Sequence, residues 1–339
     1  MSDLLKDQLD RALRGMVSMP LLRAAEQGIW PVALDQGIAG LGMDTALVPE
    51  AQGGADLAWA DLGGAFEALG FHAVPIPLGE AILAQWALAR LGLSRREDVA
   101  LALDTLTFGA RSTVSGSTQV PFGRDQSLIL ADVDQGGQTL LALIDASGAQ
   151  SASLATVGRD PAVRLDLKDA AVLASVPAGV VSLGSALAVL RAAQITGALS
   201  RILELSIDYG NTREQFGRPI GKFQAVQHLI AELAGEAACA KAGVQLALAG
   251  FDSGGGWEHA AIAKIRASAA VTRGTFAAHE VHGAIGVTEE HMLHYFTRRL
   301  WQWRDEAGTE HHWAERLGRS LLAPGPAPLW PRTVALSNA

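Results

Sequence analysis

The chain has 339 residues, of which 49% are hydrophobic and 18% are charged, and its formal net charge is −8. Proteins that bind nucleic acid need a basic face to displace counterions from phosphates, and no cluster of Lys and Arg forms one here. A membrane-surface helix also needs basic residues on its polar side, and no apolar run approaches the ~20 residues of a spanning helix. We therefore expect a soluble protein with two or three domains and no nucleic-acid or membrane partner.

The only cysteine, Cys239, excludes an intrachain disulfide and favours a reducing compartment, so a cytoplasmic location is expected. The N-terminal residues Met1–Asp7 lack the basic-then-apolar order of a signal peptide. Because Cys239 lies in an Ala-rich stretch with helical spacing, we predict a buried, inert thiol at this position.

Residues 1–97 are expected to form an N-terminal helical domain. Their apolar side chains recur at intervals of three and four residues, as on one face of a helix. Two such sets are Leu21, Leu22, Ala25, Ile29 and Ala33, and Leu62, Phe66 and Leu69. Gly53–Gly54 and Pro75–Pro77 separate the helices.

Residues 98–183 change period and predict a small β-domain. Short apolar runs with partial alternation are typical of strands, and here they cover residues 127–133, 139–144 and 163–167. Gly and Asp residues separate these runs, as expected for turns.

Residues 184–322 predict a bundle of long helices. Apolar residues step by three and four from Val226 to Leu248, and further helices are expected at 257–281, 289–304 and 310–322. The prolines within residues 323–339 predict a tail that does not continue the last helix. The fold class is therefore α+β and mainly α, in three successive domains.

The most informative motif joins two of these long helices. From Arg213 to Gln224 the chain reads R-E-Q-F-G-R-P-I-G-K-F-Q. An arginine presents a fixed fork of donors that suits carboxylate or phosphate oxygens, and Phe216 is a flat apolar side chain. The helix that begins at Gln224 has free backbone N–H groups and a positive dipole end. The alternative reading is a helical turn in which Arg213 caps the preceding helix.

This motif resembles the signature of the acyl-CoA dehydrogenases, in which the arginine reaches the flavin diphosphate of a neighbouring subunit. The resemblance extends to Val48–Gly54 in the first domain, to His279–Glu289, and to Gly308–Thr309, which matches the family's E-G-T motif. It implies the fold of that family: a helical domain, a β-barrel and a four-helix bundle. It also implies FAD as the cofactor and an acyl-CoA thioester as the substrate. The residues that the resemblance assigns to FAD are Arg213, Phe216, Gln224, Gly283, Gly308 and Thr309.

The catalytic base of the family is missing from both of its usual positions. In the family a glutamate removes the α-proton of the thioester while the β-hydrogen leaves as hydride to the flavin. The E-G-T glutamate falls on Ala307, and the second known base position falls on Leu187. Glu306 adjoins Ala307, but a step of one residue points a side chain elsewhere. We therefore expect no catalytic residue in this chain.

The flavin-ring pocket of the family is also altered. The T-E-P-x-A-G-S-D segment and the later Trp-containing strand of the family are absent, and no Trp lies between Val99 and Val181. Glu280 stands where the family has Gln, and a carboxylate there would repel a diphosphate unless it is turned away or paired.

These losses, combined with the retained signature, resemble the shorter subunit of heteromeric acyl-CoA dehydrogenases that act on steroid side chains. In such α2β2 complexes only one kind of subunit supplies the base. The resemblance implies a second acyl-CoA dehydrogenase-like subunit as partner and an electron-transfer flavoprotein as electron acceptor.

Two other readings stay open: a self-sufficient homo-oligomer that uses Glu306 as base, and a structural partner that binds no flavin. A metal site is not expected. His291 and His294 form an H-x-x-H pair, but no cysteine ligand and no H-E-x-x-H pattern accompany it.

Overall fold

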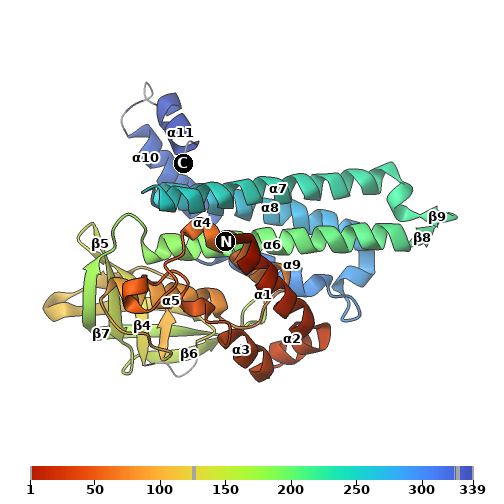
Figure 1. Cartoon of the computed structure of the whole chain (residues 1–339). Helices are drawn as coiled ribbons and strands as arrows, with labels where there is room; N and C mark the ends of the chain where they lie inside the picture. Colours follow the sequence, from red (N-terminus) through yellow and green to blue (C-terminus); the bar gives the residue numbers. More distant parts are fainter. Residues whose placement is uncertain (1, 124–126, 324, 326–328, 338–339) are drawn as a thin grey trace.

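The computed structural model describes residues 2–123, 127–323, 325 and 329–337. Helices come first along the chain, a seven-stranded sheet follows, and long helices complete it (Figure 1). The predicted mainly helical α+β fold class is confirmed.

The N-terminal helices pack around a core that they share with the bundle. They are α1 (Ser2–Met16), α2 (Met19–Glu26), α3 (Val32–Ala39), α4 (Trp59–Phe71) and α5 (Leu78–Arg90), with 3-10 turns η1 (Met43–Thr45) and η2 (Glu50–Gln52). Helix α5 is buried on most sides because it lies between the bundle and the sheet.

The strands close into a small barrel. They are β1 (Val99–Leu101), β2 (Leu106–Phe108), β3 (Thr113–Pro121), β4 (Leu128–Gln135), β5 (Gln138–Asp145), β6 (Gln150–Leu154) and β7 (Ala162–Pro177). The order β4-β2-β3-β7-β5 returns to β4 through an antiparallel β4–β5 pair, while β1 and β6 pair with β4 and β7. Alternate side chains of these strands form a separate apolar core inside the barrel.

The bundle has long helices that lie side by side in Figure 1. Its elements are α6 (Leu183–Thr212), β8 (Glu214–Gln215), β9 (Arg218–Pro219), η4 (Ile220–Lys222), α7 (Gln224–Asp252), α8 (Trp257–His282), η5 (Gly283–Val287), α9 (Leu293–Asp305), α10 (Glu310–Leu322) and α11 (Leu329–Ser337). The β8–β9 hairpin stands at one end of the bundle, and α10 and α11 lie at the other (Figure 1).

Helix α6 is the central element of the molecule. It contacts α4, α7, α8 and α9, and its crossing with α4 is close enough to require glycine on both helices. A Cβ added at Gly197 would lie 1.9 Å from the Glu67 carbonyl oxygen, and one at Gly70 would lie 1.8 Å from that of Gln194. By length and composition α6 could span a membrane, but 83% of its most apolar window is buried inside the protein, as in a core helix.

Two local expectations need correction, and the tail adds a detail. The helix predicted from residue 289 begins at Leu293, because Gly283–Val287 form η5 and the next residues turn. The tail does not continue the last helix, since α10 ends at Leu322, and it contains a separate short helix, α11. The prediction of a buried Cys239 was wrong: the thiol is exposed, because the buried stripe of α7 runs through Leu233, Ala237 and Ala240 on the other face.

Candidate functional site

Cavities at the two ends of the bundle contain most of the residues that the motif analysis singled out. The bundle-end cavity, of about 530 Å³, lies between the β8–β9 hairpin, the start of α7 and the end of α8. The interdomain cavity, of about 560 Å³, lies between the barrel, the start of α6 and α10. The structure places Arg213, Phe216 and Gly283 on the first cavity and Gly308 on the second.

Arg213 ends α6 with a side chain that is available to a ligand. Its backbone N–H donates to the carbonyl of Tyr209 at 2.8 Å, and its own carbonyl accepts the N–H of Ile220 at 2.8 Å. These bonds fix the backbone, while the exposed guanidinium lines the cavity. Within the described part of the chain that guanidinium has neither a hydrogen bond nor an ion pair, so it does not cap its own helix.

Phe216 is presented to solvent in a conformation that a bulky residue rarely adopts. Its side chain is 91% exposed and its φ is +53°, in the left-handed region. The ring meets Phe223 edge-on at 6.1 Å between centroids, and the guanidinium of Arg218 lies 4.3 Å from the centre of the Phe223 ring. Exposure and strain together indicate a residue held for contact with something outside the chain.

The remaining walls of the bundle-end cavity come from α7, α8 and η5. Gly283 reverses the chain after α8 with φ +60° and ψ −144°, a conformation available to glycine. Glu280 lines the same cavity and is exposed. Gln224 begins α7, whose first turn has no side-chain cap, so backbone N–H groups are free there, although the Gln224 side chain does not line the cavity.

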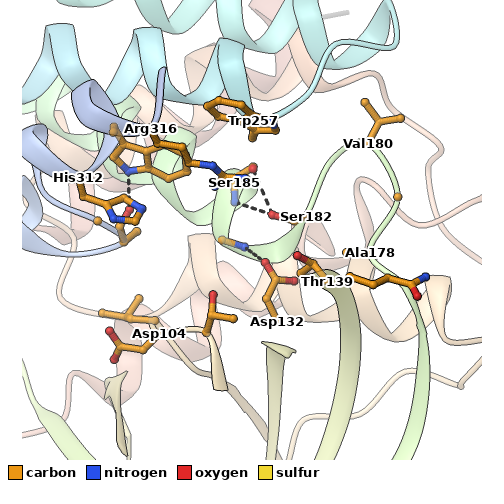
Figure 2. Close-up of a pocket in the computed structure, with 18 of the residues that line it drawn as sticks. Asp104, Asp132, Thr139, Ala178, Val180, Ser182, Ser185, Trp257, His312 and Arg316 are labelled. Carbon is orange, nitrogen blue, oxygen red and sulfur yellow. Dashed lines mark hydrogen bonds between the residues drawn. The ribbon is translucent and has the colours of Figure 1, made fainter. Parts of the chain in front are cut away.

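The interdomain cavity has its own carboxylate at the start of α6 (Figure 2). Asp132 of β4 accepts hydrogen bonds from the N–H groups of Leu183 at 3.1 Å and Gly184 at 2.8 Å. Burial raises the pKa of Asp132 above its usual range, although these N–H groups act in the opposite direction. The helix end that could receive an anionic ligand is therefore already occupied by the chain itself.

Residues 307–309, which stand in place of the E-G-T motif, are fixed by neighbouring side chains. The indole N–H of Trp313 donates to the carbonyl of Ala307 at 2.9 Å, and Nζ of Lys264 donates to the carbonyl of Gly308 at 3.0 Å. Thr309 lies outside the cavity lining and caps α10 by accepting the N–H of His312 at 3.2 Å. Ala307 itself lines the cavity with φ +53°.

Glu306 is turned into the core. Its Oε2 accepts the Nε–H of Arg191 at 2.6 Å, and its Oε1 accepts Nε2 of Gln302 at 2.7 Å. Arg191 also pairs with Glu80 of α5 at 2.7 Å. The Arg191 and Glu306 side chains are 1% and 4% exposed, and the Glu306 side chain does not line the interdomain cavity.

Sequence reasoning missed Asp132, Lys264 and Arg191. Lys264 is fully buried, and its ammonium also donates to the carbonyls of Trp303 and Arg304 at the end of α9. Burial lowers the pKa of Lys264 to about 7. The signal in the sequence was a single charged residue among apolar residues that face the core. Such a residue must have a partner inside the protein, but the sequence does not identify that partner.

In the described ranges, no group of three or more His, Cys, Asp or Glu side chains is placed to hold a metal ion.

Comparisons with known proteins agree with this geometry. The family model described as acyl-CoA dehydrogenase, C-terminal domain, matches residues 182–322. The acyl-CoA dehydrogenase IpdE2 of Mycolicibacterium smegmatis is 31% identical over 312 residues, which are 88% of this chain and 91% of that protein. The chain therefore belongs to the acyl-CoA dehydrogenase family.

Two solved structures share this fold over nearly the whole chain. A variant of the Tcur3481–Tcur3483 steroid ACAD is 25% identical with a TM-score of 0.86, covering 95% of this chain and 98% of that one. The ChsE4–ChsE5 complex from Mycobacterium tuberculosis, at 23% identity, shares the fold with a TM-score of 0.83, over 96% of this chain and 98% of that one. The expected resemblance to subunits of heteromeric steroid acyl-CoA dehydrogenases is thus confirmed, and so is FAD as the cofactor of the family.

Proposed function

We propose that this chain is the base-less subunit of a heteromeric, FAD-dependent acyl-CoA dehydrogenase, and that it contributes its bundle-end cavity to a flavin held mainly by a second family member. The observation that carries this proposal is the free guanidinium of Arg213 beside the exposed ring of Phe216. An exposed phenylalanine ring on left-handed backbone is costly to keep in a chain that acts alone.

The bundle-end cavity fits the adenosine diphosphate end of FAD. Arg213 would bind the diphosphate through charge-assisted hydrogen bonds, and the uncapped start of α7 adds N–H donors and a positive dipole end nearby. Phe216 would stack on the adenine, while Gly283 keeps the backbone free of a side chain at the turn. Glu280 is exposed, so its carboxylate can remain in water on the rim.

The interdomain cavity of this chain supports the proposal that the chain supplies no catalytic base. A thioester α-proton needs a carboxylate that is free to accept it, and the two family base positions hold Leu187 and Ala307. The carboxylates that do line the cavity are held by the chain: Asp132 accepts the N–H groups of Leu183 and Gly184, and Asp104 accepts the hydroxyl of Thr118 and the N–H of Gln119. Both oxygens of Glu306 are committed to Arg191 and Gln302. FAD, when bound to the complex, supplies the hydride acceptor for α,β-dehydrogenation. The base that takes the α-proton then comes from the partner.

We infer from the relatives that the acyl group carries a steroid-derived or similarly bulky ring system. The Tcur3481–Tcur3483 protein is a steroid ACAD, and it covers almost this whole chain. An α2β2 assembly, a cytoplasmic location and an electron-transfer flavoprotein as acceptor complete the proposal by resemblance to the family. The acyl-CoA is expected to bind at the flavin ring in the partner.

Co-expression tests this function. The chain is expressed alone and with a candidate acyl-CoA dehydrogenase-like partner, and flavin absorbance and mass are recorded for each product. We expect stoichiometric flavin only in the co-purified complex. A yellow homotetramer of the chain alone that is reduced by an acyl-CoA would support the self-sufficient alternative. A complex that forms without flavin would support the structural alternative.

A further inference from the structure

A group of stacked rings lies directly behind the bundle-end cavity. His282, the last residue of α8, stacks on Tyr209 of α6 with centroids 4.7 Å apart and an interplanar angle of 21°. His291 lies against His282 at 4.6 Å between ring centroids. The His282 side chain is buried, at 3% exposure, and both Tyr209 and His282 line the cavity.

This stack joins the two halves of the proposed cofactor site. Tyr209 holds the α6 end, because its carbonyl accepts the N–H of Arg213 at 2.8 Å. His282 holds the α8 end, because it immediately precedes Gly283. The position of Arg213 relative to the Gly283 turn therefore depends on the contact between these two rings.

The hydrogen bonds assign Nδ1 of each ring. Nδ1 of His282 lies 2.8 Å from the carbonyl of Ala278, so it carries a hydrogen, and in the neutral ring the lone pair is then on Nε2. That Nε2 is buried and has no hydrogen-bond partner in the part of the chain that the structure describes. Nδ1 of His291 accepts the N–H of Leu293 at 3.2 Å, so it is unprotonated.

The surroundings of His282 and His291 disfavour the protonated form of each ring. Burial is the main cause that lowers the pKa of His282, and His291 and His279 lower it further, whereas the carbonyls of Ala278 and Leu205 act in the opposite direction. Burial likewise lowers the pKa of His291, with His294 adding to the effect. The acidic group that lines the cavity on the same helix, Glu280, is exposed and screened by water.

We propose that His282 is a positioning residue of the cofactor-edge site: its neutral ring holds Arg213 and the Gly283 turn in register, and acid releases the cofactor end by charging it. This inference rests on the proposed function, since it assumes that the bundle-end cavity binds the adenosine diphosphate end of FAD. A folded state with a neutral histidine is favoured above about pH 6.5 and loses that advantage as the pH falls below this value.

A positive charge near a diphosphate would also attract it, and the geometry decides between the two effects. Nδ1 of His282 is turned back onto its own helix, and Nε2 is buried. Neither nitrogen offers an N–H to a ligand in the cavity. The cost of charging a ring whose Nε2 is buried without a partner, beside His291, therefore outweighs a distant attraction.

The test compares the wild-type complex with His282→Phe, which keeps a flat ring that cannot be protonated. FAD retention is measured by ultrafiltration and flavin fluorescence between pH 7.5 and 5.5, together with hydrogen exchange of residues 209–216 and 283–292. We expect the wild-type complex to weaken about 5- to 10-fold more than His282→Phe over this range, on the scale of ~1 kcal/mol. We also expect faster exchange of both segments at low pH in the wild type alone.

A second variant keeps the question answerable if His282→Phe folds poorly. His291→Gln retains an acceptor for the N–H of Leu293 but removes a ring that opposes the protonation of His282 when it is itself protonated, so the acid midpoint should move to higher pH. Equal pH profiles for all forms, or tighter wild-type retention in acid, would overturn the inference. Arg213→Met distinguishes failure of the positioning role of His282 from failure of the proposed function. If this variant leaves FAD retention unchanged, the proposed function itself fails.

Discussion

The two cavities of this chain differ in what their polar groups do. In the interdomain cavity, Asp132 accepts a hydrogen bond from an N–H group at the start of α6. Trp313 and Lys264 donate hydrogen bonds to the carbonyls of Ala307 and Gly308. In the bundle-end cavity, the exposed guanidinium of Arg213 has no hydrogen bond or ion pair to any residue that the structure describes. Polar groups that bond to one another within the chain stabilise the fold. Donors without such bonds are available to a partner or a ligand.

The largest expected effect concerns the buried ion network of Arg191, Glu80 and Glu306. Arg191→Met leaves Glu80 and Glu306 buried without their cation, and we expect it to lower the free energy of unfolding by about 3–5 kcal/mol. Urea denaturation measures this loss. The matched control adds Glu80→Leu and Glu306→Leu, which should recover most of the stability. A wild-type-like Arg191→Met would show that the network is not structural.

Arg213→Met tests the opposite cavity. It should leave the fold intact, because the side chain is exposed and the backbone bonds remain. We expect FAD retention by the complex to weaken about 10- to 100-fold, from the loss of one or two charge-assisted bonds worth ~1.5–3 kcal/mol. Arg164→Met on β7, also exposed, is the control. Equal retention in both variants would contradict a diphosphate site at Arg213.

Phe216→Gly separates ligand contact from local strain. Glycine accepts the φ of +53° without penalty, so the chain should be no less stable in thermal unfolding. FAD retention should fall by at least about 5-fold, because stacking of a base on an aromatic ring is worth ~1–3 kcal/mol. If both stability and retention are unchanged, the exposed ring has no role in the cofactor site.

The smallest effect is expected for Glu306→Gln. Dehydrogenation of an acyl-CoA by the complex, followed with an artificial electron acceptor, should change by no more than about twofold, because the carboxylate is held by Arg191. Some stability should be lost from the weaker pair with Arg191. A loss of turnover of about a hundredfold or more would identify Glu306 as the base.

The sequence predicted the three regions of the fold because each has its own period, and it placed Arg213, Phe216 and Gly283 in one site because a resemblance carried them together. It could not find Asp132, Lys264 or Arg191. Their partners lie far along the chain, as with Asp132 and Gly184, and such pairings follow only from the packing of α6 between the barrel and α9. Cys239 shows the same limit, since neighbours in sequence do not reveal which face of a helix is buried.

The count of flavins in the assembled complex tests the central claim most directly. Native mass spectrometry of the co-purified complex gives the number of FAD molecules and of each chain. The account predicts one FAD for each pair of unlike chains, because the interdomain cavity of this chain holds none. Two FAD molecules per pair would contradict it and would make this cavity a flavin site of its own.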